Sequence, residues 1–118
     1  IKIMVITYIH IYQKSHHTKT KKNWAELELV TEEWVENEPN NTEAWYELGY
    51  AYEKLNKVAE ALVAYDKALE IDQNNSDALL REAVIYKNKG DENKVAQIQA
   101  TLDDVDPNKA WILKNNKY

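Results

Sequence analysis

Residues 42–75 read TEAWYELGYAYEKLNKVAEALVAYDKALEIDQNN, and this stretch decides the fold. Its apolar residues recur every three or four positions, which is the spacing of one face of an α-helix. They form two stripes, the first made of Trp45, Leu48, Gly49, Tyr52 and Leu55, the second of Val58, Ala61, Leu62, Tyr65, Ala68, Leu69 and Ile71. We therefore predict two antiparallel helices, over residues 42–56 and 57–72, joined by a short turn.

Two small residues indicate how closely these helices approach each other. Gly49 and Ala61 lie on the facing stripes, and side chains of this size let two helix backbones come together. The larger side chains around this contact fill the remaining space, and they are Trp45, Leu48, Tyr52 and Tyr65. The pair is therefore predicted to be a tight helical hairpin.

Helical periodicity extends in both directions from this hairpin. Four further helices are predicted: residues 24–37 after an Asn23 cap, a helix capped by Ser76 or Asp77 that runs through Lys89, one capped by Asp91 that runs to Val105, and a short helix over 109–115. Thr42 is the predicted cap of the helix over 42–56, Gly90 a C-terminal glycine, and Asp106-Pro107 a stop signal. The result is a run of antiparallel helices.

A period of 34 residues runs through these helices. Trp45 and Leu79 are 34 residues apart, and so are Tyr52 and Tyr86. The motif W-x₂-L-G-x₂-Y, complete over residues 45–52, is typical of tetratricopeptide repeats, and residues 42–75 strongly resemble that family. The matches at residues 76–107 and 24–39 are degenerate, since Glu82 replaces the motif leucine in the former.

The resemblance implies both an architecture and a role. It implies an all-α fold of antiparallel helix-turn-helix repeats, stacked as a short right-handed superhelix. It also implies a protein–protein interaction module that holds a peptide or protein segment in a concave groove lined by the first helix of each repeat. We expect a non-enzymatic protein whose partner is a protein or peptide.

A second stripe on the first helices marks the candidate groove. Tyr46 and Tyr50 lie about 100° around the helix axis from the core stripe. These residues either line the groove or pack against neighbouring repeats. With their counterparts one repeat later and the charged residues around them, the candidate set is Glu43, Tyr46, Glu47, Tyr50, Glu53, Leu80, Arg81, Val84 and Lys87.

The stripe also indicates what kind of segment fits the groove. One subclass of the family clamps a C-terminal carboxylate with Lys and Asn at these positions, but this chain has Tyr46 and Tyr50 there, and only Arg81 fits the basic pattern. The clamp is therefore not carried over. A hydrophobic or mildly basic segment suits tyrosines flanked by glutamates better.

Composition excludes several other classes of protein. The chain has 118 residues, no Cys and two Gly, so it lacks thiolate chemistry, cysteine-ligated metals and glycine-rich phosphate loops. Its three histidines, at positions 10, 16 and 17, have no spaced carboxylate that would complete a metal site. Residues 23–118 carry ten bases and twenty acids, which disfavours nucleic-acid binding. We expect no cofactor, metal or nucleic acid.

Residues 1–22 differ from the rest, which is predicted to be one repeat domain over 23–118. They carry five lysines and no acid, and residues 1–12 are strongly apolar. This segment is interpreted as a first helix, with a strand or the remnant of a membrane anchor with a basic linker as alternatives. The corresponding alternatives for function are a membrane-tethered assembly factor and a self-associating, homodimeric domain. A cytoplasmic location is expected, with membrane association as the alternative.

Overall fold

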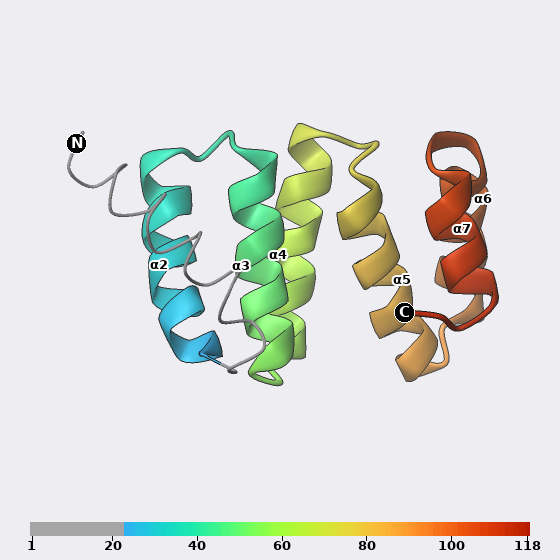
Figure 1. Cartoon of the computed structure of the whole chain (residues 1–118), viewed down its shortest axis with the longest axis horizontal. Helices are drawn as coiled ribbons and strands as arrows, with labels where there is room; N and C mark the ends of the chain where they lie inside the picture. Colours follow the sequence, from blue (N-terminus) through green and yellow to red (C-terminus); the bar gives the residue numbers. More distant parts are fainter. Residues whose placement is uncertain (1–22) are drawn as a thin grey trace.

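The computed structural model describes residues 23–118, and this part of the chain folds into helices with no strand. The helices are α2 (Trp24–Asn37), α3 (Thr42–Lys54), α4 (Val58–Ile71), α5 (Ser76–Lys89), α6 (Glu92–Val105) and α7 (Pro107–Lys114). The prediction of an all-α fold made of antiparallel helices and short turns is confirmed (Figure 1).

The alternatives for residues 1–22 lie outside the described residues, and the predicted domain boundary at residue 22 stays a prediction. Within residues 23–118, no helix combines the length and the apolar character that a membrane crossing requires.

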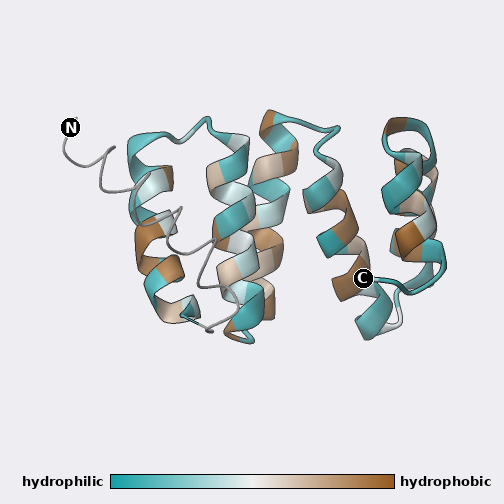
Figure 2. Cartoon of the chain, in the orientation of Figure 1, coloured by the Kyte–Doolittle hydropathy of each residue, from teal (hydrophilic) through white to brown (hydrophobic). Residues whose placement is uncertain are grey.

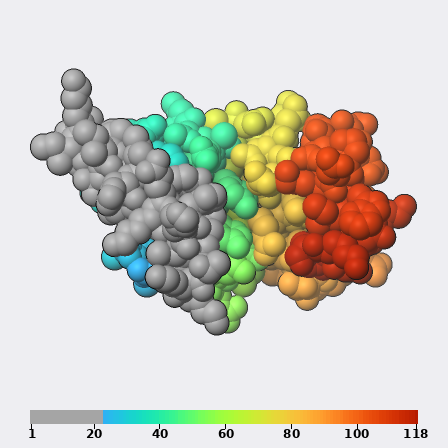
Figure 3. All heavy atoms as spheres, in the orientation of Figure 1, coloured from blue at the N-terminus to red at the C-terminus, as the bar shows by residue number. Residues whose placement is uncertain are grey.

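The helices stack in the order of the sequence. Each packs against the next along the chain, and α5 additionally contacts α3 and α7. Figure 1 shows this order running from α2 to α6 and α7, and the colours of Figure 3 follow one another along the same axis. In repeat arrays each unit contacts only its neighbours, so local packing sets the shape of the whole stack. We call α3 with α4 the first repeat and α5 with α6 the second.

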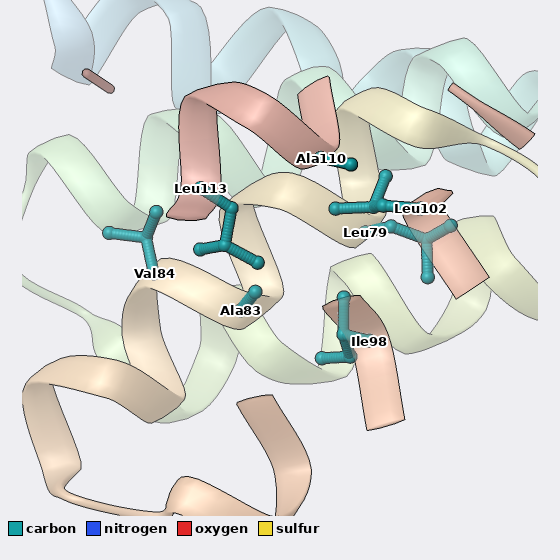
Figure 4. Packing of buried hydrophobic residues seen from close by; sticks show 7 residues of the cluster. All are labelled: Leu79, Ala83, Val84, Ile98, Leu102, Ala110 and Leu113. Atoms are coloured by element: carbon teal, nitrogen blue, oxygen red, sulfur yellow. The ribbon is translucent and has the colours of Figure 1, made fainter. Parts of the chain in front are cut away.

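The core lies between the helices rather than at one centre. Figure 2 shows hydrophobic and hydrophilic residues alternating within the helices, as amphipathic helices require. The predicted core residues Leu48, Ala61 and Tyr65 are buried, while Trp45 and Tyr52 are partly buried against the same clusters. A third cluster joins the second repeat to α7 and consists of Leu79, Ala83, Val84, Ile98, Leu102, Ala110 and Leu113 (Figure 4).

Hydrogen bonds tie the start of each repeat to the end of its own second helix, and one bond from Asn75 links the first repeat to the start of the second. Thr42 Oγ1 donates to the carbonyl oxygen of Ala68 at 2.9 Å and accepts from Asn75 Nδ2 at 3.1 Å. One repeat later, Ser76 Oγ donates to Asp106 Oδ2 at 2.8 Å. These bonds fix the register of the stack because they join residues 26 to 33 positions apart.

Two predicted helix caps, Thr42 and Ser76 or Asp77, were placed too late in the sequence. Asn41, not Thr42, caps α3 by accepting from the amide of Ala44, and Asn75 caps α5 by accepting from the amide of Ala78. Asn side chains are among the best N-caps, and both helices begin directly after one. The hydroxyls of Thr42 and Ser76 instead donate to Ala68 and Asp106 at the end of the second helix of the same repeat.

The other helix-end predictions had mixed outcomes. Asp91 caps α6 as predicted, and Gly90 ends α5 at φ 79°, a left-handed conformation that glycine adopts without strain. Asn23, the predicted cap of α2, makes no side-chain cap hydrogen bond. Asp106-Pro107 stops α6 as predicted, since that helix ends at Val105, and Pro107 also opens α7 after an Asp106 cap, before the start predicted at residue 109. A proline fits the first position of a helix because the amide there has no helical partner.

Candidate functional site

The candidate residues lie on two neighbouring helices. Residues 43, 46, 47, 50 and 53 belong to α3, and residues 80, 81, 84 and 87 belong to α5, which contacts α3. Their spacing of three or four positions places the members of each group along one side of their helix. The 34-residue period makes Tyr46 the counterpart of Leu80, and Tyr50 the counterpart of Val84.

A partly buried ion pair joins the two helices. Arg81 Nε donates to Glu53 Oε1 at 3.1 Å, and Arg81 Nη2 donates to Glu53 Oε2. Tyr65, from α4, donates its hydroxyl to Glu53 Oε1 at 2.8 Å. The side chains of Arg81 and Glu53 are only 19% and 15% exposed. Such a two-pronged guanidinium–carboxylate pair is geometrically specific, so it fixes α5 against α3.

The surroundings keep these groups in their present protonation states. Burial raises the pKa of the Tyr65 hydroxyl, and the charge of Glu53 raises it further. Burial alone would lower the pKa of Arg81, but the hydrogen bond and charge of Glu53 raise it overall. Tyr65 therefore remains a hydrogen-bond donor and Arg81 a cation across the range in which proteins are folded.

Aromatic rings continue this face toward α2. The ring of Trp24 meets Tyr50 edge-on with centroids 5.6 Å apart, and Tyr50 stacks on Tyr46 at 6.3 Å. Tyr46 in turn lies 5.9 Å from the buried ring of Tyr65. Trp24, Tyr50 and Tyr46 are all partly exposed, and we call these three residues the aromatic row. Burial, followed by the charges of Asp77 and Glu47, raises the pKa of Tyr46.

Two cations lie over the aromatic row. Lys54 Nζ is 5.3 Å from the ring centroid of Tyr50 and 5.8 Å from that of Trp24, and Arg81 Cζ is 5.8 Å from that of Tyr50. Within about 6 Å, the negative face of an aromatic ring attracts a cation. The aromatic row therefore offers both apolar area and affinity for positive charge.

The structure brings some candidates together and separates others. Tyr46, Tyr50, Glu53 and Arg81 form one connected group, and Glu43 is exposed on the same helix. Glu47 also belongs to α3, but it is only 3% exposed.

The candidates on α5 lie beside α7. Val84 is 4% exposed inside the cluster that includes Leu113, and Leu80 packs against that cluster (Figure 4). Lys87 Nζ donates to the carbonyl oxygen of Leu113 at 3.4 Å and to Asn116 Oδ1. Val84 therefore packs against the neighbouring unit, which was the alternative to lining the groove. The unit concerned is α7, which follows α5 in the stack as α5 follows α3.

Three residues of this face were not among the candidates. Trp24 and Tyr65 were assigned to helix cores, and Lys54 was not considered. Lys54 follows Tyr50 by four positions on the same helix, a spacing at which side chains meet, and this signal could have identified it. The contact of Trp24 with Tyr50 depends on how α2 packs on α3, which periodicity does not specify.

The rest of the described chain carries no obvious chemical centre. In residues 23–118, no group of three or more His, Asp or Glu side chains could hold a metal ion. The three histidines that the sequence analysis considered as metal ligands, at positions 10, 16 and 17, lie outside the described residues. A surface hollow beside the turn between α5 and α6 is lined by residues that include Lys87, Val95 and Gln99, away from the aromatic row.

Comparison with known families agrees with this architecture. A family model described as tetratricopeptide repeat matches residues 42–75, and a second model with the same description matches residues 64–97. The two matches overlap and together cover the predicted repeat at 42–75 and most of the one at 76–107, while the degenerate match at 24–39 lies outside both. The family suggested by the motif at residues 45–52 is thus confirmed by the matches to longer segments.

Several curated proteins are similar to the chain over part of their length. The PEX5-related protein of Homo sapiens is 33% identical over 90 residues, which cover 76% of this chain and 13% of that protein. The peroxisomal targeting signal receptors of Komagataella phaffii and Candida albicans are 33% and 32% identical over 69 residues, 58% of this chain and 12% of each receptor. The chain thus spans only 12–13% of the length of these relatives.

Proposed function

We propose that this chain, a protein-interaction module whose residues 42–97 belong to the tetratricopeptide repeat family, binds a peptide segment of a partner protein on the face formed by α3 and α5. The observation that carries the proposal is the aromatic row, which places three partly exposed rings side by side. Rings of Trp and Tyr are favoured in binding surfaces because they supply large contact areas at little cost in conformational entropy.

The fixed geometry of the face supports this role. The Glu53–Arg81 pair and the Tyr65 hydrogen bond hold α3, α4 and α5 together, so Tyr46 and Tyr50 on α3 are already in place when a partner arrives. A surface that is already ordered loses less entropy on binding. Glu43 is exposed on α3 and adds negative charge to the edge of the face, so the segment expected to bind is hydrophobic or mildly basic.

The relatives support recognition as the general role. Two of them are named as receptors for a peroxisomal targeting signal, and we carry over from those names only that a protein with a similar segment recognises a signal. The proposed module has no catalytic part, because the face offers packing and charge rather than an acid–base pair or nucleophile in a cavity.

A library of random twelve-residue peptides tests the proposal. Peptides enriched on the wild-type chain are synthesised, and their affinities are measured by calorimetry for the wild type and for the Tyr46→Ala/Tyr50→Ala double variant. We expect at least a tenfold loss of affinity, because truncating aromatic anchors at an interface commonly costs about 2 kcal/mol or more.

The matched control is Val63→Ala on α4, since Val63 is 60% exposed and lies outside the candidate face. Circular dichroism verifies that each variant is folded. Unchanged affinity in a folded double variant, or an equal loss with Val63→Ala, would rule out the proposed face. Light scattering on the same samples distinguishes peptide binding by a monomer from the self-association alternative.

A further inference from the structure

We propose that Trp24 and Tyr50 form a site for a basic side chain of the partner peptide, and that Lys54 occupies this site in the free protein. The inference rests on the proposed function and specifies the chemistry of the partner, a segment with a Lys or Arg residue. It follows from three features of the face: the geometry of the rings, the environment of Lys54 and the charge around the aromatic row.

The two rings are placed to hold a cation between them. Their planes are inclined by 77° with centroids 5.6 Å apart, so they form two walls of a corner rather than a flat stack. Lys54 Nζ lies within 6 Å of both centroids. A cation near both rings is attracted by two π systems at once, and Trp is the strongest of the aromatic residues in this interaction.

Lys54 depends on these rings for its contacts in the described part of the chain. No carboxylate oxygen of residues 23–118 lies within 4 Å of its ammonium group. Lys57 provides the contrast: it lies 5.9 Å from the ring of Tyr52 but is also bound to Glu28 at 2.5 Å. Lys54 is exposed, so another cation can displace it into water without breaking an ion pair.

The charge around the site favours replacement by another cation over binding of an anion. The second cation over Tyr50 is Arg81, which is already neutralised by Glu53. Asp77 and Glu47 lie close enough to Tyr46 to raise its pKa, so negative charge surrounds the far end of the aromatic row. A basic side chain from the partner would replace the charge of Lys54, while an acidic one would meet these carboxylates.

The test uses the tetramethylammonium ion as a probe, because it is a compact cation that cannot form a hydrogen bond. Binding is followed by NMR through the indole N–H of Trp24, with sodium chloride as the ionic-strength control and tert-butanol as a neutral molecule of similar shape. In Lys54→Met the site loses its internal competitor. We expect about two- to fivefold tighter binding of tetramethylammonium than in the wild type, the range that an exposed cation–π contact supports.

Lys114→Met is the matched control, because it removes the same charge from an exposed position on α7. A second substitution, Tyr50→Leu in the Lys54→Met chain, should abolish the gain. Where that chain fails to fold, Trp24→Leu provides the same test from α2, followed by the backbone amide of Tyr50. Equal affinities in Lys54→Met and Lys114→Met, or equal shifts with tert-butanol, would overturn the cation site.

The peptide library separates this inference from the proposed function. Peptides recovered on the wild type and on Lys54→Met should be enriched in Lys and Arg over Asp and Glu. Recovery of mainly acidic peptides, with binding weakened by Lys54→Met, would overturn the cation site and leave the peptide-binding face standing. The peptide affinity of the Tyr46→Ala/Tyr50→Ala variant tests the peptide-binding face itself.

Discussion

At the scale of single residues, Gly49 makes room for the ring of Tyr65. A Cβ atom at position 49 would lie 2.6 Å from both Cδ1 and Cε1 of Tyr65, closer than such atoms approach. We expect Gly49→Ala to lower the free energy of unfolding by about 1–3 kcal/mol, as overpacking does. This loss would appear in urea denaturation although alanine favours helix by about 1 kcal/mol over glycine.

The background variant Tyr65→Leu shows whether the ring is responsible. In a Tyr65→Leu chain, Gly49→Ala should be neutral or stabilising, because the edge of the ring no longer occupies the space. A similar loss in both backgrounds would mean that the glycine is required for a reason other than close packing. The second repeat is consistent with the steric reason, since it pairs Ala83 with Gln99 at the corresponding positions.

Glu82 is a buried acid at the position where the first repeat has Leu48. It is 9% exposed, and its Oε2 atom has no hydrogen-bond donor within residues 23–118. Burial, together with the hydrogen bond and charge of Asp66, raises the pKa of Glu82 from its ordinary 4.5 to about 8, against a smaller opposing effect of Lys94. Folding therefore favours the protonated form of this carboxyl group, which titrates together with that of Asp66.

This raised pKa gives the stability a pH dependence of known sign. The folded chain binds the proton more tightly than the unfolded chain, so the contribution of Glu82 is complete below pH 4.5 and is lost as the pH rises to about 8. Glu82→Gln keeps a neutral group there and should flatten this part of the profile. At pH 9 we expect the variant to be about 1–3 kcal/mol more stable than the wild type in urea denaturation.

Glu33→Gln controls for the loss of one negative charge, because Glu33 is exposed on α2. It should leave the slope of stability against pH between 4.5 and 8 unchanged. A wild-type profile that rises with pH in this interval, with the same slope in Glu82→Gln, would contradict the assignment.

At the scale of the elements, the Glu53–Arg81 pair is the main polar link between α3 and α5. Arg81→Met removes the cation and leaves a partly buried carboxylate whose remaining hydrogen-bond donor within residues 23–118 is the Tyr65 hydroxyl from α4. We expect the free energy of unfolding to fall by about 1–3 kcal/mol in urea denaturation, the usual cost of an unsatisfied charged partner. The double variant Glu53→Gln/Arg81→Met should lose less than the sum of the two single variants, because neither charge is then left alone. Strict additivity would show that the pair is not coupled.

The helices themselves were the most predictable elements. Their apolar stripes follow from the need to bury one side of each helix, and this need acts within a single segment of sequence. The caps were less predictable, because Asn41 and Thr42 are both good cap residues. The choice between them depends on distant partners, Ala68 in α4 and Asn75 before α5, which bind the hydroxyl of Thr42. The start of α7 at Pro107 was missed because a proline that ends one helix can also begin the next.

At the scale of the whole molecule, the 34-residue period predicted the stack of repeats but not which faces remain open. The same period made Tyr50 and Val84 equivalent, yet Tyr50 is partly exposed and Val84 is buried in the cluster with Leu113. The difference comes from the neighbours of each helix, and a period describes the repeat rather than its neighbours. For the same reason the rings of Trp24 and Tyr50, contributed by two elements, could not be paired from sequence alone.

The position of the Glu53–Arg81 pair within the same face as the aromatic row has a consequence for evolution. Arg81 touches both Glu53 and the ring of Tyr50, so a change at position 81 alters the stiffness of the stack and the chemistry offered to a guest together. A mutation at this position therefore changes the ligand preference and the stiffness of the helix stack at the same time. Diversification of specificity is easier at Lys54, which is exposed and takes no part in the Glu53–Arg81 pair, than at position 81.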